Sequence, residues 1–208
     1  MFSSGHKIAS QLFPSIVWAK DTGTPDVYFT FDDGPHPEFT PQILNILKSY
    51  NLKATFFLIG ENVLKYPQIV SQIYEQGHTV GLHSYSHKNL IFKSRKQLLY
   101  ELLQPQKIIK NIIGFRPPLF RPPFGKFTPR LIKLCREVKL TMVMWTIMSY
   151  DFNLKIPDNR IINRMLKHLQ NGAIIVFHDG NKNSARTIKI LPCIIKFVLQ
   201  KGNLPKKL

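Results

Sequence analysis

Acidic residues are scarce in this chain of 208 residues: 12 aspartates and glutamates stand against 29 lysines and arginines, for a formal net charge of +17 at pH 7. A surplus of this size favours an anionic partner, such as nucleic acid, lipid head groups or an acidic polymer of the cell envelope. A basic surface that is merely solvated explains the charge about equally well. The charge therefore indicates which partners to test and does not identify one.

Cysteine is almost absent, and the two that occur, Cys135 and Cys193, lie far apart in apolar stretches typical of helices. Neither belongs to a CxxC pair, which excludes a disulfide-rich scaffold and a zinc knuckle. The pattern predicts two free, buried thiols, because an unpaired cysteine behaves as a small apolar residue. Free thiols favour a reducing compartment.

A long apolar run is also missing. A membrane-spanning helix needs about 20 consecutive apolar residues, and a secretory signal needs an apolar core of about 7–15 residues near the N-terminus. The first 20 residues instead contain polar side chains such as Ser4, His6 and Lys7. We therefore expect no transmembrane segment and a location in the cytoplasm or at the periphery of a membrane, where basic residues meet anionic lipid.

Short apolar stretches alternate with longer amphipathic ones, in a composition that is 44% hydrophobic. Strands are predicted over residues 27–31, 54–58, 79–82, 141–147 and 173–177, and helices over 63–76, 94–113, 158–170 and 184–201 and from Thr40 and Thr128 onward. This alternation favours an α/β fold with a mainly parallel sheet. We assign residues 27–202 to one domain, residues 1–26 to an N-terminal extension and residues 203–208 to a basic tail.

Polar side chains gather directly after the predicted strands, where loops build the sites of α/β proteins. Asp32 and Asp33 follow the first strand and precede Gly34-Pro35. Because side chains alternate along an extended chain, one carboxylate can bind a metal while the other faces a substrate water. The alternative is an ordinary acidic turn, for which this sequence is also typical.

His83 and His87 lie four residues apart after the third predicted strand, and a helical turn would place both imidazoles on one face. Alone, the two histidines could equally form a surface pair. Together with Asp33 from a neighbouring strand end, they form a candidate three-ligand site. Two histidines and a carboxylate suit zinc, with cobalt, nickel and manganese as alternatives.

Three further positions could supply reacting groups. Arg121 precedes Pro122-Pro123-Phe124-Gly125, a stiff loop that can hold a guanidinium and a backbone N–H in fixed places, or simply a structural turn. His178 ends the most apolar strand and could donate a proton, since its ordinary pKa is roughly 6.5. Asp151, if it lies beside His178, would raise that pKa. A core histidine and a solvated loop acid are the alternatives.

These motifs together resemble the polysaccharide deacetylase family, the NodB homology domain of carbohydrate esterase family 4, from about Val27 to about Gly202. Four stretches stand in the family's order: Thr30–Pro35, His83–His87, Arg121–Gly125 and Val176–Asp179. The resemblance implies a distorted (β/α) barrel with about seven strands. It also implies a hydrolase that removes N-acetyl or O-acetyl groups from an acetylated carbohydrate with a divalent metal, zinc above all.

By motif position, the resemblance implies a role for each candidate residue. The implied metal ligands are Asp33, His83 and His87. The implied catalytic groups are Asp32 as general base with Arg121 orienting it, His178 as general acid with Asp151 tuning it, and the backbone N–H of Phe124 as an oxyanion donor.

The fourth motif departs from the family pattern Asp-x-x-Asp-Trp. Here it reads Met148-Ser149-Tyr150-Asp151-Phe152, which keeps the second acid but lacks the first acid and the tryptophan. The substrate therefore stays open between chitin oligomers, peptidoglycan, a lipid-linked saccharide and an O-acetylated glycan. Two alternatives to the enzyme are a catalytically silent carbohydrate-binding relative and, with less support, a nucleic-acid-binding protein, for which no motif of interleaved aromatic and basic residues is found.

Overall fold

The computed structural model describes residues 4–20 and 22–208. The strands are β1 (Asp26–Asp32), β2 (Thr55–Leu58), β3 (Thr79–Leu82), β4 (Leu119–Phe120), β5 (Thr141–Met142), β6 (Ile147–Met148), β7 (Ile174–His178) and β8 (Leu204–Lys206). The helices are α1 (Ser4–Leu12), α2 (Phe39–Ser49), α3 (Gly60–Lys65), α4 (Pro67–Glu75), α5 (Arg95–Ile113), α6 (Pro129–Glu137), α7 (Asp158–His168) and α8 (Ser184–Gln200), with a short 3₁₀ helix, η1 (Pro123–Gly125).

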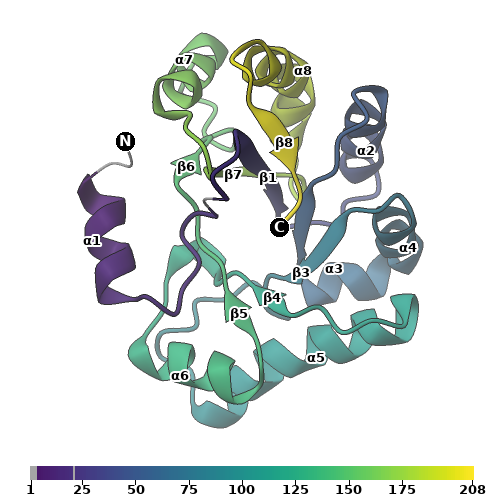
Figure 1. Cartoon of the computed structure of the whole chain (residues 1–208). Helices are drawn as coiled ribbons and strands as arrows, with labels where there is room; N and C mark the ends of the chain where they lie inside the picture. The colour runs from purple at the N-terminus through teal and green to yellow at the C-terminus, as the bar shows by residue number, and fades with distance from the viewer. Residues whose placement is uncertain (1–3, 21) are drawn as a thin grey trace.

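All strand pairs are parallel, and the hydrogen-bonded order is β5-β4-β3-β2-β1-β7-β6, with β8 added beside β1. The sheet curls so that its two ends approach each other, and the helices lie around the outside (Figure 1). The predicted α/β fold with a parallel, barrel-like sheet is confirmed.

The barrel is closed by the chain itself rather than by a ladder between its end strands. β5 pairs with β4 at one end of the sheet, and β6 pairs with β7 at the other, so residues 143–146 cross the gap. Val17 pairs with the start of this crossing by donating to Met142 O (2.9 Å) and accepting from Met144 N (2.8 Å). The prediction of a single strand over residues 141–147 is therefore wrong. Within these residues the chain leaves β4 at one end of the sheet and joins β7 at the other.

The predicted helix over 63–76 is also wrong as one element. It is split into α3 and α4 at Tyr66, whose φ of −133° and ψ of 54° are not helical. Pro67 explains the break, because its ring disfavours the helical conformation of the preceding residue. Pro67 then begins α4, where the missing N–H has no intrahelical partner to lose.

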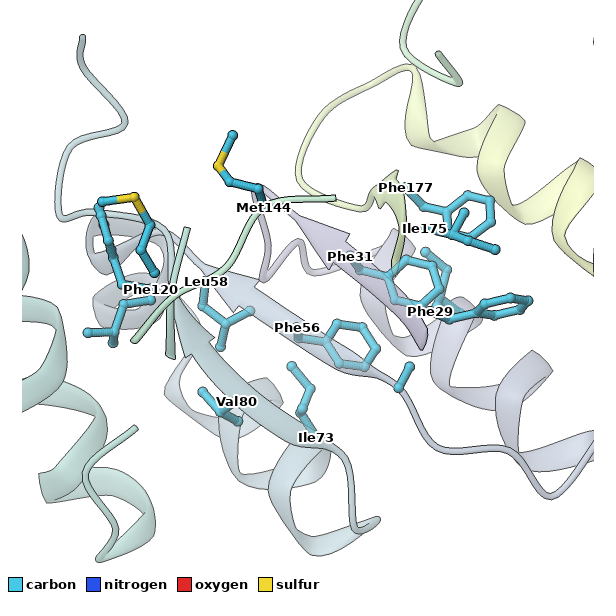
Figure 2. Packing of buried hydrophobic residues seen from close by; sticks show 14 of the residues in the cluster. Phe29, Phe31, Phe56, Leu58, Ile73, Val80, Phe120, Met144, Ile175 and Phe177 are labelled. Atoms are coloured by element: carbon cyan, nitrogen blue, oxygen red, sulfur yellow. The ribbon is translucent and has the colours of Figure 1, made fainter. Parts of the chain in front are cut away.

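Alternation along β1 separates two kinds of packing. Phe29 and Phe31 point to the helical layer, where Phe31 stacks on Phe56 (5.0 Å between ring centroids) and on Phe177 (5.4 Å) (Figure 2). Thr30 and Asp32 take the other face, toward the inside of the barrel. The aromatic layer thus fixes the register that carries Asp32 to the carboxyl end of the barrel.

Cys135 and Cys193 are both free, as predicted, but the predicted burial is confirmed only for Cys135, because Cys193 is partly exposed. No helix in the described part of the chain is long and apolar enough to cross a membrane. The division into an extension, a domain and a tail stays a prediction, although Leu204–Lys206 of the tail forms β8 and α1 lies in the extension.

Candidate active site

One pocket of about 430 Å³ opens at the carboxyl ends of the strands. It is lined by Asp32, Asp33, His83, His87, Pro122, Phe124, Gly125, Trp145, Met148, Phe152 and His178. Six of the eight predicted site residues are in this lining, and the other two, Arg121 and Asp151, are buried behind it. The structure therefore brings together groups that the sequence spreads over almost 150 positions.

Asp33, His83 and His87 form a cluster that could hold a metal ion. Asp33 Oδ1 lies 3.5 Å from His83 Nε2 and 3.2 Å from His87 Nε2. Two ligands bound tetrahedrally to zinc at about 2.1 Å are separated by roughly 3.4 Å, so the spacing fits such an ion. His83 Nδ1 lies 2.8 Å from the carbonyl oxygen of Arg121, to which it can donate, and this leaves Nε2 free as a ligand.

The ionisation of Asp33 suits this role. Burial tends to raise the pKa of its carboxyl, but hydrogen bonds from His83 and His87 outweigh burial and hold the pKa well below its ordinary value. Asp33 is therefore negatively charged and contacts both imidazoles of the cluster.

The loop that carries the two histidines is not a helical turn, although both imidazoles reach the same cluster. Ser84 and His87 have positive φ values of 63° and 52°. Glu101 of α5 holds the loop by accepting from Tyr85 N (3.0 Å), Ser86 N (2.9 Å) and Ser86 Oγ (2.6 Å). The loop turns back on itself because a buried carboxylate collects its backbone donors.

Arg121 is fully buried inside the barrel and holds Asp32 at the pocket wall. Its guanidinium donates to Asp32 Oδ1 (2.7 Å), to Thr30 Oγ1 (2.8 Å), and to the carbonyl oxygens of Val143 (3.2 Å) and Met144 (3.0 Å). Burial lowers the pKa of Arg121 despite the opposing charge of Asp32. Arginine nevertheless stays charged in proteins, so Asp32 has a fixed cation on one oxygen.

His178 and Asp151 form a second pair on the other side of the pocket. His178 Nδ1 lies 2.7 Å from Asp151 Oδ1, and His178 N donates to Asp151 Oδ2 (2.8 Å), which Thr187 Oγ1 also contacts (2.6 Å). Burial tends to lower the pKa of His178, but the hydrogen bond and charge of Asp151 raise it to about 9. His178 is therefore protonated at neutral pH, and its other ring nitrogen is left for the pocket.

The loop after β4 presents Phe124 in a left-handed conformation, with φ 60° and ψ 10°. Its side chain is exposed and its ring lies 4.8 Å from that of His87. Within residues 4–20 and 22–208, no group accepts a hydrogen bond from the Phe124 N–H. This donor is thus available beside the metal cluster.

The remaining wall of the pocket is apolar. Trp145, Met148 and Phe152 line it, and the ring of Phe152 stands edge-on to His178 at 5.0 Å between centroids. Met148 and Phe152 are the two departures in the fourth motif. They change the surface that a substrate meets and leave the His178–Asp151 pair intact.

Sequence reasoning missed three buried supports: Thr30 under Arg121, Glu101 under the histidine loop and Thr187 behind Asp151. Glu101 had a signal, because it lies three residues after Leu98 on the apolar face of a helix, where a solvated acid is not expected. Thr187 had none, since an ordinary threonine in α8 gives no indication that it contacts a loop 36 residues earlier.

Comparison with known sequences gives matches over much of the chain. The profile of a family described as polysaccharide deacetylase matches residues 19–143. A peptidoglycan-N-acetylglucosamine deacetylase of Bacillus cereus is 37% identical over 154 residues, which cover 74% of this chain and 56% of that protein. A chitooligosaccharide deacetylase of Azorhizobium caulinodans is 34% identical over 155 residues, or 74% of this chain and 73% of that protein. The chain thus spans little more than half the length of the first relative.

Solved structures give the same family. A peptidoglycan N-acetylglucosamine deacetylase in complex with 4-naphthalen-1-yl-N-oxidanyl-benzamide has a TM-score of 0.90 at 31% identity, covering 96% of this chain and 94% of that one. A pseudoenzyme of carbohydrate esterase family 4 from Bacillus anthracis has a TM-score of 0.85 at 25% identity, covering 94% of this chain and 68% of that one. The same fold therefore occurs with and without activity, so the residues of the site must decide.

Proposed function

Because the chain belongs to the polysaccharide deacetylase family, we propose that its pocket hydrolyses the N-acetyl group of N-acetylglucosamine units in peptidoglycan or a similar glycan. The family predicted from the motifs is confirmed by the matches, and the names of the relatives support the predicted deacetylation of a carbohydrate. The observation that carries the proposal is the pocket itself, where Asp32 and His178 face one space beside the cluster of Asp33, His83 and His87.

We propose zinc as the native metal, because two imidazole nitrogens and one carboxylate oxygen at this spacing suit it. Cobalt, nickel and manganese are the alternatives to test. A divalent cation held by Asp33, His83 and His87 would polarise the acetyl carbonyl and ease the ionisation of water.

On the base side, Asp32 would accept a proton from the attacking water. Its Oδ1 is occupied by Arg121 at 2.7 Å, which leaves Oδ2 toward the pocket, 4.0 Å from His83 Nε2. The water oxygen forms a bond to the acetyl carbon, and the carbonyl oxygen gains negative charge. The free N–H of Phe124 is placed to donate to that oxygen, which is the usual way a backbone donor stabilises such a transition state.

On the acid side, His178 would donate its proton to the leaving nitrogen as the C–N bond breaks. The products are acetate and the free amine of the sugar. Asp151 keeps His178 protonated at neutral pH and fixes its ring. The chain thus supplies an acceptor for the proton of the water and a donor for the leaving nitrogen, and no covalent enzyme intermediate is needed.

The test is acetate release from N-acetylglucosamine oligomers and from peptidoglycan by the purified protein, with and without added zinc. We expect release that a chelator and Asp32→Asn both abolish and that zinc restores only in the wild type. Glycan binding without release by the metal-loaded wild type, on every acetylated glycan tried, would establish the silent relative instead.

We also propose that the preferred glycan carries acidic groups, as the charge of +17 suggests. A second pocket of about 420 Å³ lies next to the histidine loop and is lined by Glu61, Tyr85, Ser86, Lys88, Lys93, Lys96, Gln97, Tyr100 and Glu101. Lys93 pairs with Glu101 at 3.3 Å. In the described part of the chain, Lys88 and Lys96 form no ion pair, so they can meet an anionic group.

Lys88→Gln with Lys96→Gln tests this partner, with the exposed Lys48→Gln and Lys110→Gln as a control of equal charge loss outside the pocket. We expect a higher KM on acidic peptidoglycan fragments for the first pair only, with neutral chitin oligomers unaffected. Equal effects of both pairs would indicate general attraction by the basic surface. Vesicles of anionic lipid and a duplex DNA, assayed for salt-sensitive binding, would show whether membrane or nucleic acid is the partner instead.

A further inference from the structure

A further buried acid, Asp179, follows His178 and has no part in the proposed chemistry. Its side chain is fully buried. Oδ2 accepts from Thr40 Oγ1 at 2.5 Å, whereas Oδ1 is buried with no hydrogen-bond partner among the described residues. A buried carboxyl group with half of its hydrogen-bonding capacity unused is costly, so its retention needs a reason.

Asp179 lies directly beneath the turn that carries Asp33. A Cβ atom on Gly34 would come within 2.5 Å of Asp179 Oδ2 and 2.6 Å of Oδ1, so only a glycine lets the turn sit on this carboxyl group. On the next residue, a Cβ on Gly180 would lie 2.0 Å from Asp33 O. The residues that follow β7 therefore lie against the backbone of the turn that follows β1.

Hydrogen bonds tie the same turn at both ends. Asp179 N donates to Asp32 O (3.0 Å), just before the turn. Thr40 Oγ1 accepts from His36 N (2.9 Å), just after it, while donating to Asp179. Thr40 and Asp179 thus form one clamp across the residues between Asp32 and His36.

The clamp matters because Asp33 has a φ of 77°, in the left-handed region that residues with a side chain seldom adopt. Such a conformation persists only where the surroundings hold it. In this conformation the Asp33 carboxylate reaches His83 and His87, at 3.5 and 3.2 Å.

We propose that Thr40 and Asp179 are positioning residues that hold Asp33 in its metal-binding conformation and thereby set the affinity of the site for its metal. The inference rests on the proposed metal-dependent function and extends it to two residues that do not touch the metal or the substrate. Groups that support metal ligands from behind commonly change metal affinity about 10–100-fold.

The test compares Thr40→Val, which has the same shape but cannot donate to Asp179, with Thr40→Ser, which keeps the hydroxyl. The zinc dissociation constant is measured by competition with a chelating dye, and thermal unfolding of the metal-free proteins is recorded beside it. We expect zinc binding about tenfold weaker in Thr40→Val and within about threefold of the wild type in Thr40→Ser. At saturating zinc, much of the lost activity should return.

Thr55→Val is the control. Thr55 is a buried threonine at the amino end of β2, whereas the pocket lies at the carboxyl ends of the strands, and its Oγ1 accepts from Leu208 N. It should lower the unfolding temperature without changing zinc affinity. If Thr40→Val behaves in the same way, the clamp is only structural and the proposal is overturned.

A second pair of variants covers the case in which Thr40→Val does not fold. Asp179→Asn keeps an oxygen for Thr40 and fills the same volume, so zinc affinity should stay near that of the wild type. Asp179→Ser removes the support under Gly34, so zinc should bind about tenfold less tightly. Equal affinities of the two variants would overturn the clamp. A wild type that binds no divalent metal would instead overturn the proposed function itself.

Discussion

The two sides of the pocket use the same arrangement for opposite purposes. On the base side, the carboxylate of Asp32 faces the pocket and the cation Arg121 is buried behind it. On the acid side, the imidazole of His178 faces the pocket and the carboxylate of Asp151 is buried behind it. In both pairs the partner behind the wall does not line the pocket, and yet it decides what the pocket-facing group can do.

The pairs differ in what their buried partner controls. Arg121 is held by four hydrogen bonds to β1 and to the 143–144 crossing, and its charge does not vary near neutral pH. Asp151 instead changes the pKa of the group in front of it. The base side should therefore respond to mutation at every pH, and the acid side should respond in a pH-dependent way.

The largest effect should come from Asp32→Asn, which keeps the shape but removes the proton acceptor. We expect kcat to fall about 10²–10⁴-fold across the pH range, because general base catalysis typically contributes that much. Metal content, measured by elemental analysis, should stay at the wild-type level. An activity within a few-fold of the wild type would remove Asp32 from the role of base.

Arg121→Lys should have the next largest effect. The charge remains, but one ammonium cannot replace a planar guanidinium that contacts Asp32, Thr30 and two carbonyl oxygens. We expect kcat to fall about 100-fold through misplacement of Asp32, with the shape of the pH profile unchanged. A shifted profile with a normal maximum rate would mean that Arg121 tunes ionisation and does not orient.

Asp151→Asn tests the acid side of the pocket. The reaction needs protonated His178, so activity is present below the pKa of His178 and is lost as pH rises through it. Since Asp151 raises that pKa to about 9, its removal should move the basic limb of the kcat profile to lower pH.

The pH dependence separates this variant from those of the base side. The loss should be on the order of tenfold or more at pH 8 and smaller at lower pH, because burial without Asp151 leaves His178 with a lower pKa than in the wild type. A uniform loss at all pH values would show that Asp151 only orients the ring.

The pocket-facing members of both pairs could be predicted from the sequence, together with their partners, because each follows a strand and belongs to a motif. The parallel sheet could be predicted from the alternation of short apolar stretches with longer amphipathic ones. The crossing at residues 143–146 could not be predicted. A segment that passes from one end of the sheet to the other has the same apolar composition as a continuous strand. Supports such as Thr40 and Thr187 come from helices distant in sequence, and only the packing of those helices on the barrel brings them to the site.

Phe152→Trp should have the smallest effect, because it leaves both pairs intact. Phe152 lies on the acid side, half exposed, with its ring against His178. A tryptophan restores the side chain usual at this place in the family and offers a larger apolar face and an N–H to a sugar ring. KM and the choice between chitin oligomers and peptidoglycan should change, by less than about tenfold, because the added contacts act on binding.

Both limbs of the pH profile should stay in place in Phe152→Trp, since neither Asp32 nor the His178–Asp151 pair is altered. Phe92→Trp is the matched control, because Phe92 is 92% exposed and does not line the pocket. If the Phe152 variant moves the basic limb, the aromatic wall contributes to the ionisation of His178. The apolar wall that selects the substrate would then not act independently of the reacting groups on this side of the pocket.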